Sequence, residues 1–194
     1  MNKPKPQSRI RQTGLVLREM MRSPADMGTI CPSSRALAGA MADAVSPSRL
    51  GPNDLVVELG AGTGPVTAAL LSHGVPQSNL LVIEKSEPLA ACLKEKFPYL
   101  DVRCDAAEEL ADMAAGRNIR AVISSLPFRT LPREVSLVIM NEIEKSLSRG
   151  GLYAQFTYAL LGGMPYIPRS FKRITTRIVL LNIPPAKVVV FRKS

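Results

Sequence analysis

The sequence has few of the aromatic, histidine and cysteine residues on which base-stacking surfaces and metal centres usually depend. Tryptophan is absent and aromatic residues make up only 5% of the chain, which disfavours a base-stacking platform. The single histidine, His73, stands before Gly74 at the end of a predicted helix, where we expect it to cap the helix. Three cysteines, Cys31, Cys92 and Cys104, lack metal-ligand spacing, and their odd number predicts reduced thiols in a cytoplasm.

Long apolar runs are also missing. No stretch of roughly 18 apolar residues is present and no signal peptide with a small-residue cleavage site is seen, so no transmembrane segment is expected. With 194 residues and 46% hydrophobic content, the chain is predicted to form one α/β domain with a full core. The net charge of +9 predicts an anionic partner surface, either nucleic acid or an acidic membrane, and composition does not choose between them.

A glycine-rich turn organises the chain. The apolar residues 55–57 predict a buried parallel strand that runs into Glu58, followed by Gly60, Gly62 and Gly64. Pro65 suits the first turn of a helix. Alternating glycines let backbone N–H groups and the helix N-terminus approach a ligand closely. The spacing differs from the dinucleotide and P-loop patterns and no lysine follows, which disfavours a phosphate-type cofactor.

Two acids follow later strands. Residues 80–83 predict a second buried strand that ends at Glu84, where a carboxylate can take both hydroxyls of a ribose. Asp105 follows a short strand predicted over residues 101–104, where it could reach an adenine amino group. The order of turn, acid and acid therefore predicts a nucleoside-type cofactor.

The remaining pattern predicts alternating helices and strands. A helix over 35–45, capped by Ser33 or Ser34, precedes the first strand. Further helices are predicted over 88–97, 106–113 and 135–147, the last ended by Arg149, Gly150 and Gly151, with strands over 121–124 and 152–158. A mobile loop is expected over 160–171, and residues 174–181 and 187–191 predict a closing hairpin.

The N-terminal segment is basic. Residues 1–7 predict a disordered lead, and residues 8–22 predict an amphipathic helix with arginines on one face and Ile, Leu and Met on the other. This helix either packs on the domain or lies in an anionic membrane interface. The organisation predicted is a basic membrane-binding segment over 1–23 and a catalytic domain over 24–194.

The ordered set of glycine turn and acids resembles class I S-adenosylmethionine-dependent methyltransferases. That resemblance implies a Rossmann-like seven-stranded sheet whose last strand is antiparallel, and S-adenosylmethionine as the cofactor, with S-adenosylhomocysteine as the product. It assigns cofactor binding to twelve residues: Ser33, Glu58, Gly60, Ala61, Gly62, Thr63, Gly64, Glu84, Lys85, Asp105, Ala106 and Ser124.

Two families within that class are similar. The rRNA adenine dimethyltransferases carry Asn, Leu or Ile, Pro, and Tyr or Phe after strand four, whereas this chain has Ser125, Leu126, Pro127 and Phe128, with serine in place of asparagine. Those enzymes also continue into a helical RNA-binding domain. Residues 8–194 instead resemble the bacterial phospholipid N-methyltransferases through GTICPSSRALAGAMA, ELGAGTGPVT, SSLPF and QFTYALLGGMPYIPRSF.

The second resemblance implies methylation of phosphatidylethanolamine toward phosphatidylcholine by a peripheral enzyme on the inner face of the cytoplasmic membrane. Its implied partners are an anionic membrane surface and the phospholipid, with neither nucleic acid nor an obligate protein partner. The implied acceptor-site residues are Ser125, Phe128, Tyr158 and Tyr166, and the lipid or membrane contacts are Arg11, Leu17, Arg18, Met21, Arg22, Arg129 and Arg169. No metal is needed. The proton acceptor stays open between Tyr158, Tyr166, water and the lipid phosphate. The alternatives are an rRNA adenine methyltransferase and a non-catalytic cofactor-binding module.

Overall fold

The computed structural model describes residues 34–194. The amphipathic helix predicted over residues 8–22 lies outside the described residues, as do Ser33 and the predicted membrane contacts Arg11, Leu17, Arg18, Met21 and Arg22. Among the described residues, no helix combines the length and the apolar character that crossing a bilayer requires.

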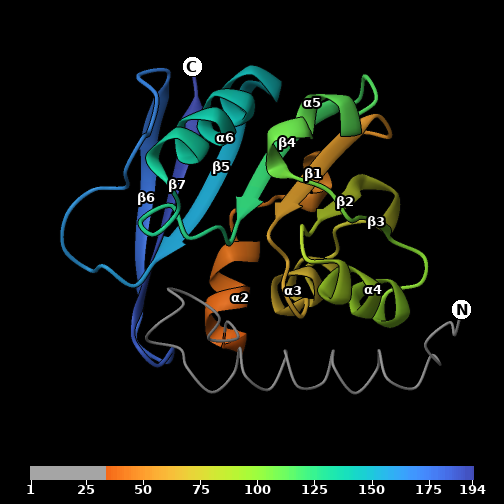
Figure 1. Ribbon diagram of the computed structural model, residues 1–194, viewed down its shortest axis with the longest axis horizontal. Helices are drawn as coiled ribbons and strands as arrows, with labels where there is room; N and C mark the ends of the chain where they lie inside the picture. The colour runs from red at the N-terminus through yellow and green to blue at the C-terminus, as the bar shows by residue number, and fades with distance from the viewer. Residues whose placement is uncertain (1–33) are drawn as a thin grey trace, which may run out of the picture. The chain divides into compact units, whose positions relative to one another are not determined.

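Seven strands form one sheet in the order β3-β2-β1-β4-β5-β7-β6 (Figure 1). Their bounds are β1 Asp54–Leu59, β2 Leu80–Ile83, β3 Asp101–Arg103, β4 Asn118–Ser124, β5 Leu147–Thr157, β6 Phe171–Val179 and β7 Ala186–Lys193. The pairs from β3 to β5 are parallel, and β7 is antiparallel to both of its neighbours. The expected Rossmann-like sheet with an antiparallel last strand is therefore confirmed.

Helices cover both faces of this sheet. On one face lie α2 (Arg35–Ala42), α3 (Pro65–Ser72) and α4 (Glu87–Lys96), and on the other lie α5 (Leu110–Met113) and α6 (Arg133–Ser146) (Figure 1). Short 3₁₀ turns span Pro47–Arg49, Gln77–Asn79 and Ala107–Glu109. Because successive side chains of a strand point to opposite faces, Val56 belongs to the core cluster on the first face and Val57 to the cluster on the second.

Two predicted helix caps are present. The Ser34 hydroxyl accepts a hydrogen bond from the backbone N–H of Leu37 at 3.2 Å, which caps the N-terminus of α2. His73 is the C-cap residue of α3, and its ring lies 3.1 Å from the carbonyl of Ala69 and 2.8 Å from a carboxylate oxygen of Asp43. The predicted capping role of His73 is confirmed.

The fifth strand differs from the prediction. The sequence Arg149-Gly150-Gly151 predicts the end of a helix, but α6 already ends at Ser146 and β5 begins at Leu147. Residues 148–151 form a bulge, because the β4–β5 register shifts between Ile119 and Ala121, and Gly150 takes a φ of +74° there. The glycines thus mark an irregularity inside a strand, not a helix stop.

Candidate active site

The glycine turn connects β1 to α3. Gly60, Gly62 and Gly64 have φ values of +71°, +59° and +82°, which side-chain-bearing residues rarely adopt. A Cβ atom on Gly60 would lie 2.8 Å from the Leu126 side chain, and one on Gly64 would lie 2.8 Å from the side chains of Leu93 and Phe97. Two of the glycines are therefore required by close packing as well as by backbone conformation.

Glu84 closes this turn from the end of β2. Its side chain is 8% exposed, and one carboxylate oxygen accepts a hydrogen bond from the backbone N–H of Gly62 at 2.8 Å. The other oxygen accepts from the backbone N–H of Ser86 at 2.9 Å. Since a carboxylate oxygen can accept more than one hydrogen bond, Glu84 is positioned by the protein while retaining capacity toward a ligand hydroxyl.

Glu58 lies at the end of β1 and is completely buried. Its Oε2 accepts a hydrogen bond from the Thr67 hydroxyl at 2.6 Å, whereas Oε1 has no hydrogen-bond partner among the residues that the structure describes. Burial raises the pKa of Glu58 from its ordinary value of 4.5 to about 7, because desolvation disfavours the carboxylate. A buried acid with an unsatisfied oxygen is suited to receive a donor or a cation.

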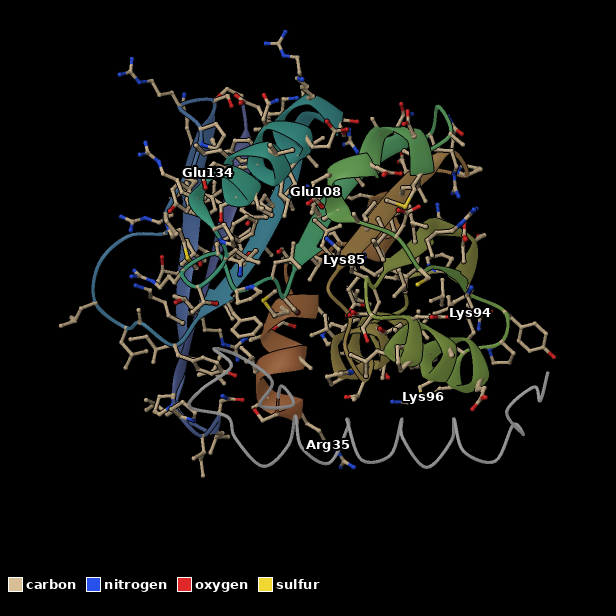
Figure 2. All side chains as sticks on the ribbon, viewed as in Figure 1. Arg35, Lys85, Lys94, Lys96, Glu108 and Glu134 are labelled. Atoms are coloured by element: carbon tan, nitrogen blue, oxygen red, sulfur yellow. The ribbon has the colours of Figure 1, made fainter. Side chains whose placement is uncertain are left out.

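The other predicted cofactor residues are spread around the turn. Ala61 is buried and Thr63 is exposed, and the Thr63 carbonyl accepts a hydrogen bond from Lys96 at 3.0 Å. Lys85, labelled in Figure 2, is exposed just beyond β2. The partly buried Asp105 follows β3 and accepts a hydrogen bond from the Ala106 backbone at 2.8 Å. Ser124, the last residue of β4, is buried.

The residues present fit a nucleoside cofactor that carries positive charge. The turn leaves no room for side chains at Gly60 and Gly64, and a Cβ atom on Gly62 would meet nothing within 4 Å. Glu58 offers an unpaired oxygen beneath the turn, and Glu84 and Asp105 follow two neighbouring parallel strands. Parallel strands bind ligands at their carboxyl ends, where all three acids stand.

Residues 125–128, the predicted acceptor site and called the acceptor turn below, follow β4 and lie next to the glycine turn. The backbone N–H of Ser125 donates to the carbonyl of Leu59 at 2.9 Å, and the carbonyl of Leu126 accepts from the Gln155 amide at 2.9 Å. Gln155 is buried and accepts in turn from the Tyr153 hydroxyl at 2.9 Å. The segment is thus fixed from β1 on one side and from β5 on the other.

Phe128 is buried in this conformation. Its side chain is 5% exposed and belongs to the core cluster beneath α6. The ring therefore packs against protein where an acceptor-facing ring would need an open face. Ser125, in contrast, is partly exposed on the same turn. The acceptor role of both residues stays a prediction, and for Phe128 it requires the surrounding loop to open.

The two tyrosines of the predicted site pack on different faces of the sheet. Tyr158 follows β5, joins the cluster of α2 and α3, and meets the Phe156 ring edge-to-face with centroids 5.5 Å apart. Tyr166 packs against the opposite cluster and has a φ of +61°. The two tyrosines therefore contact different core clusters, and the acceptor role of each stays a prediction.

Two basic side chains donate hydrogen bonds to backbone carbonyls of the loop between β5 and β6. Lys187 is 7% exposed and its ammonium donates to the carbonyls of Leu160 and Gly162 at 2.9 and 2.7 Å. Arg129 donates to the carbonyl of Gly163 at 2.9 Å, and Arg169 is exposed. Beneath this loop lies a hollow of about 350 Å³, lined mainly by apolar groups together with Arg173 and Lys187.

Two solved methyltransferase structures are similar to this fold. TrmN from Thermus thermophilus superposes with a TM-score of 0.65 at 17% identity, over 89% of this chain and about half, 52%, of that chain. The N-methyltransferase NodS from Bradyrhizobium japonicum, in complex with S-adenosylhomocysteine, gives a TM-score of 0.65 at 10% identity, over 91% of this chain and 97% of that chain. The chain has the class I S-adenosylmethionine-dependent methyltransferase fold.

A curated protein is similar to this chain in sequence. It is an ornithine lipid N-methyltransferase from Singulisphaera acidiphila, 29% identical over 138 residues, which cover 68% of this chain and 72% of the relative. No protein-family model matches the sequence.

Three residues that hold the candidate site in place were not predicted from the sequence. Thr67 binds the buried Glu58, Gln155 holds the acceptor turn, and Lys187 anchors the loop after β5. Thr67 lies nine residues beyond Glu58, on the buried face of α3. A polar residue on an apolar helix face was the available signal for Thr67, and a glutamine between the apolar residues Ala154 and Phe156 was the signal for Gln155.

Proposed function

We propose that the chain is an S-adenosylmethionine-dependent N-methyltransferase whose acceptor is the amine of a membrane lipid headgroup, with phosphatidylethanolamine as the first candidate. The observation that carries the cofactor assignment is the glycine turn closed by Glu84 above the unsatisfied oxygen of Glu58. The similarity to a lipid N-methyltransferase supports the acceptor class.

The cofactor would be held by the turn and the three acids. Gly60, Gly62 and Gly64 allow close approach of the backbone, Glu84 meets the ribose hydroxyls, and Asp105 meets the adenine amine. Glu58 lies near the turn, and a cationic ligand beside it would favour its charged form. When bound, S-adenosylmethionine supplies an electrophilic methyl group on a sulfonium.

The protein's own task is then to align a neutral amine and exclude water. The turn from Ser125 to Phe128 lies beside Gly60, since the Leu126 side chain is the group that a Cβ on Gly60 would meet. Gln155 fixes the carbonyl of Leu126, and the acceptor nitrogen would be positioned against this turn. Tyr158, Tyr166, water or the lipid's own acidic group receives the proton.

A lipid acceptor is supported by the hollow beneath the β5–β6 loop. Its mainly apolar lining suits an acyl chain, and Arg173 and Lys187 supply positive charge for an acidic headgroup. Arg129, which donates to the carbonyl of Gly163, and Arg169, which is exposed in the same β5–β6 loop, are further candidates for that charge. An ornithine lipid is the second candidate acceptor, because it is the substrate in the name of the curated relative.

Labelled methyl transfer tests this function. The full chain is incubated with methyl-labelled S-adenosylmethionine and three acceptors in parallel: vesicles containing phosphatidylethanolamine, vesicles containing ornithine lipid, and total RNA. We expect label in the organic phase with phosphatidylethanolamine vesicles and none in RNA. Gly60→Val serves as the matched inactive control, because its side chain would occupy the space of Leu126.

The alternative outcomes separate the competing functions. Label only with ornithine lipid would retain the lipid N-methyltransferase and change its substrate. Label in RNA would instead support the nucleic-acid methyltransferase, and label in no acceptor despite cofactor binding would support a non-catalytic module. Either of the last two results would overturn the proposed function.

A further inference from the structure

The tip of the β6–β7 hairpin, residues 180–185, exposes large aliphatic side chains. Leu180 is 73% exposed, Leu181 is 84% exposed and Ile183 is 86% exposed. Singly exposed aliphatic residues are ordinary on protein surfaces, but three of them within four consecutive positions form a local patch. Pro184 and Pro185 complete the tip, and both are exposed. We call residues 180–185 the hairpin tip.

Hydrogen bonds and buried residues fix the conformation of the hairpin tip. Asn182, between the exposed residues, is 1% exposed. Its side-chain oxygen accepts from the backbone N–H of Ser34 at 3.0 Å, and its side-chain amide donates to the carbonyl of Pro184 at 2.7 Å. At the base, Val179 and Ala186 pair across the hairpin and are buried in the core. Buried contacts therefore hold the backbone in a shape that turns Leu181 and Ile183 outward.

The hairpin tip lies at the same edge of the sheet as the candidate active site. β7 is antiparallel to both β5 and β6, so β6 runs parallel to β5 and ends at the carboxyl edge. The glycine turn after β1 and the acceptor turn after β4 stand at that edge too (Figure 1). A surface that received the hairpin tip would thus face the entrance to the cofactor and acceptor turns.

The chain segment that contains the hairpin tip carries side-chain charges of one sign. From Lys145 to Ser194 the chain has nine Lys or Arg residues and no Asp or Glu. Lys172, Arg173 and Arg177 are exposed on β6, and Arg35, labelled in Figure 2, follows the Ser34 backbone that binds Asn182. Arg177 is paired with one carboxylate oxygen of Asp43, and the other carboxylate oxygen of Asp43 binds His73. An aliphatic patch within a basic, acid-free segment matches an anionic bilayer surface.

We propose that the hairpin tip inserts into the headgroup region of a bilayer containing anionic phospholipid and so presents the active-site edge to the lipid. This inference rests on the proposed function only for the chemical nature of the substrate. A second copy of the chain is a poorer occupant, because a two-fold contact would bring the same acid-free basic strand against itself. Aliphatic side chains also offer no face on which a nucleic-acid base would stack.

The absence of tryptophan makes a direct test available, because one introduced tryptophan is the only one in the protein. Leu181→Trp in the full chain should show blue-shifted emission with vesicles of phosphatidylglycerol and phosphatidylcholine, and quenching by lipids brominated on the acyl chains. The matched control is Tyr99→Trp, since Tyr99 is also 84% exposed but precedes β3 at the opposite edge of the sheet. Its emission should not change.

A second variant measures the contribution to binding. Leu181→Asp combined with Ile183→Asp should weaken vesicle affinity by about tenfold or more, because both apolar side chains are lost and negative charge faces an anionic surface. Methyl transfer to the same lipid dispersed in detergent should be unchanged. Tyr99→Asp should change neither property.

The outcomes separate this inference from the proposed function. Unshifted emission from Leu181→Trp, or an equal shift in both tryptophan variants, would overturn insertion of the hairpin tip even if lipid methylation is observed. An emission shift that depends on protein concentration without vesicles would assign the hairpin tip to a second copy and also overturn the inference. A blue shift together with no methyl transfer to any lipid would retain the inference while the proposed function fails.

Discussion

The buried acid Glu58 predicts an unusual dependence of stability on pH. Its folded-state pKa of about 7 lies above the ordinary value of 4.5, and the first cause is desolvation. Between these two values the unfolded chain releases the proton while the folded chain keeps it. The free energy of unfolding therefore falls as the pH rises through this window, and the loss is complete above the folded-state pKa.

The size of the effect follows from the two pKa values. The gap between 4.5 and about 7 corresponds to a loss of about 3 kcal/mol in the free energy of unfolding. Glu58→Gln preserves the shape of the side chain but carries no titrating proton. Relative to the wild type, this variant should gain about 3 kcal/mol on going from about pH 4.5 to about pH 8.

Urea denaturation of both proteins across that range measures the difference, and the comparison cancels the titration of all other groups. Thr67→Val is a useful companion, because it removes the hydroxyl that stabilises the carboxylate and should move the loss of stability to higher pH. Saturating S-adenosylmethionine should reduce the loss in the wild type, since a cation near Glu58 favours its charged form. Parallel pH profiles for wild type and Glu58→Gln would refute the reasoning.

The remaining predictions concern the ligand, the acceptor turn and the N-terminal segment. Gly60→Val and Glu84→Ala should each weaken S-adenosylmethionine binding at least about tenfold in calorimetric titration while the fold is retained by circular dichroism, and unchanged affinity in both would remove the cofactor assignment. Phe128→Ala should lower the melting temperature, consistent with a loss of about 3 kcal/mol or more for a buried ring, and a variant as stable as wild type with reduced turnover would favour the acceptor role. Deletion of residues 1–22 should leave cofactor binding intact and reduce sedimentation with anionic vesicles, because each basic residue near such a surface contributes about 1 kcal/mol, and undiminished sedimentation would make that segment an ordinary packing element.

Features that depend on neighbouring residues in the sequence could be predicted from the sequence. Alternating glycines after an apolar run predicted the turn at Gly60, and the hydrophobic residues 80–83 predicted β2 with its bounds. The bulge at the start of β5 was not predictable in this way, because Gly150 and Gly151 resemble a helix stop locally and only pairing with β4 reveals the strand. Local sequence fails where a neighbouring strand decides the conformation.

In the candidate site, too, residue identities could be predicted, whereas burial and long-range contacts could not. Residue types and spacing located Glu58 and Glu84, but the burial that raises the pKa of Glu58 depends on the packing of the fold, and the hydrogen bond from Thr67 in α3 partly opposes that rise. Phe128 was predicted as an acceptor face from its position after β4, whereas the fold places it in the core beneath α6. Asn182 falls between the two predicted strands of the closing hairpin, and its function in holding the hairpin tip depends on contact with Ser34, which is distant in sequence.

The proposed reaction is N-methylation of a lipid headgroup at the edge of the sheet where the glycine turn lies. Its most direct measurement uses S-adenosylmethionine with a deuterated methyl group, separate vesicles of phosphatidylethanolamine and of ornithine lipid, and mass spectrometry of the extracted lipid, with fragmentation to locate the label. We expect deuterated methyl groups on the headgroup nitrogen with wild-type protein and none with Gly60→Val. Unlabelled lipid from a wild-type protein that binds the cofactor, or label at any atom other than an amine nitrogen, would contradict it.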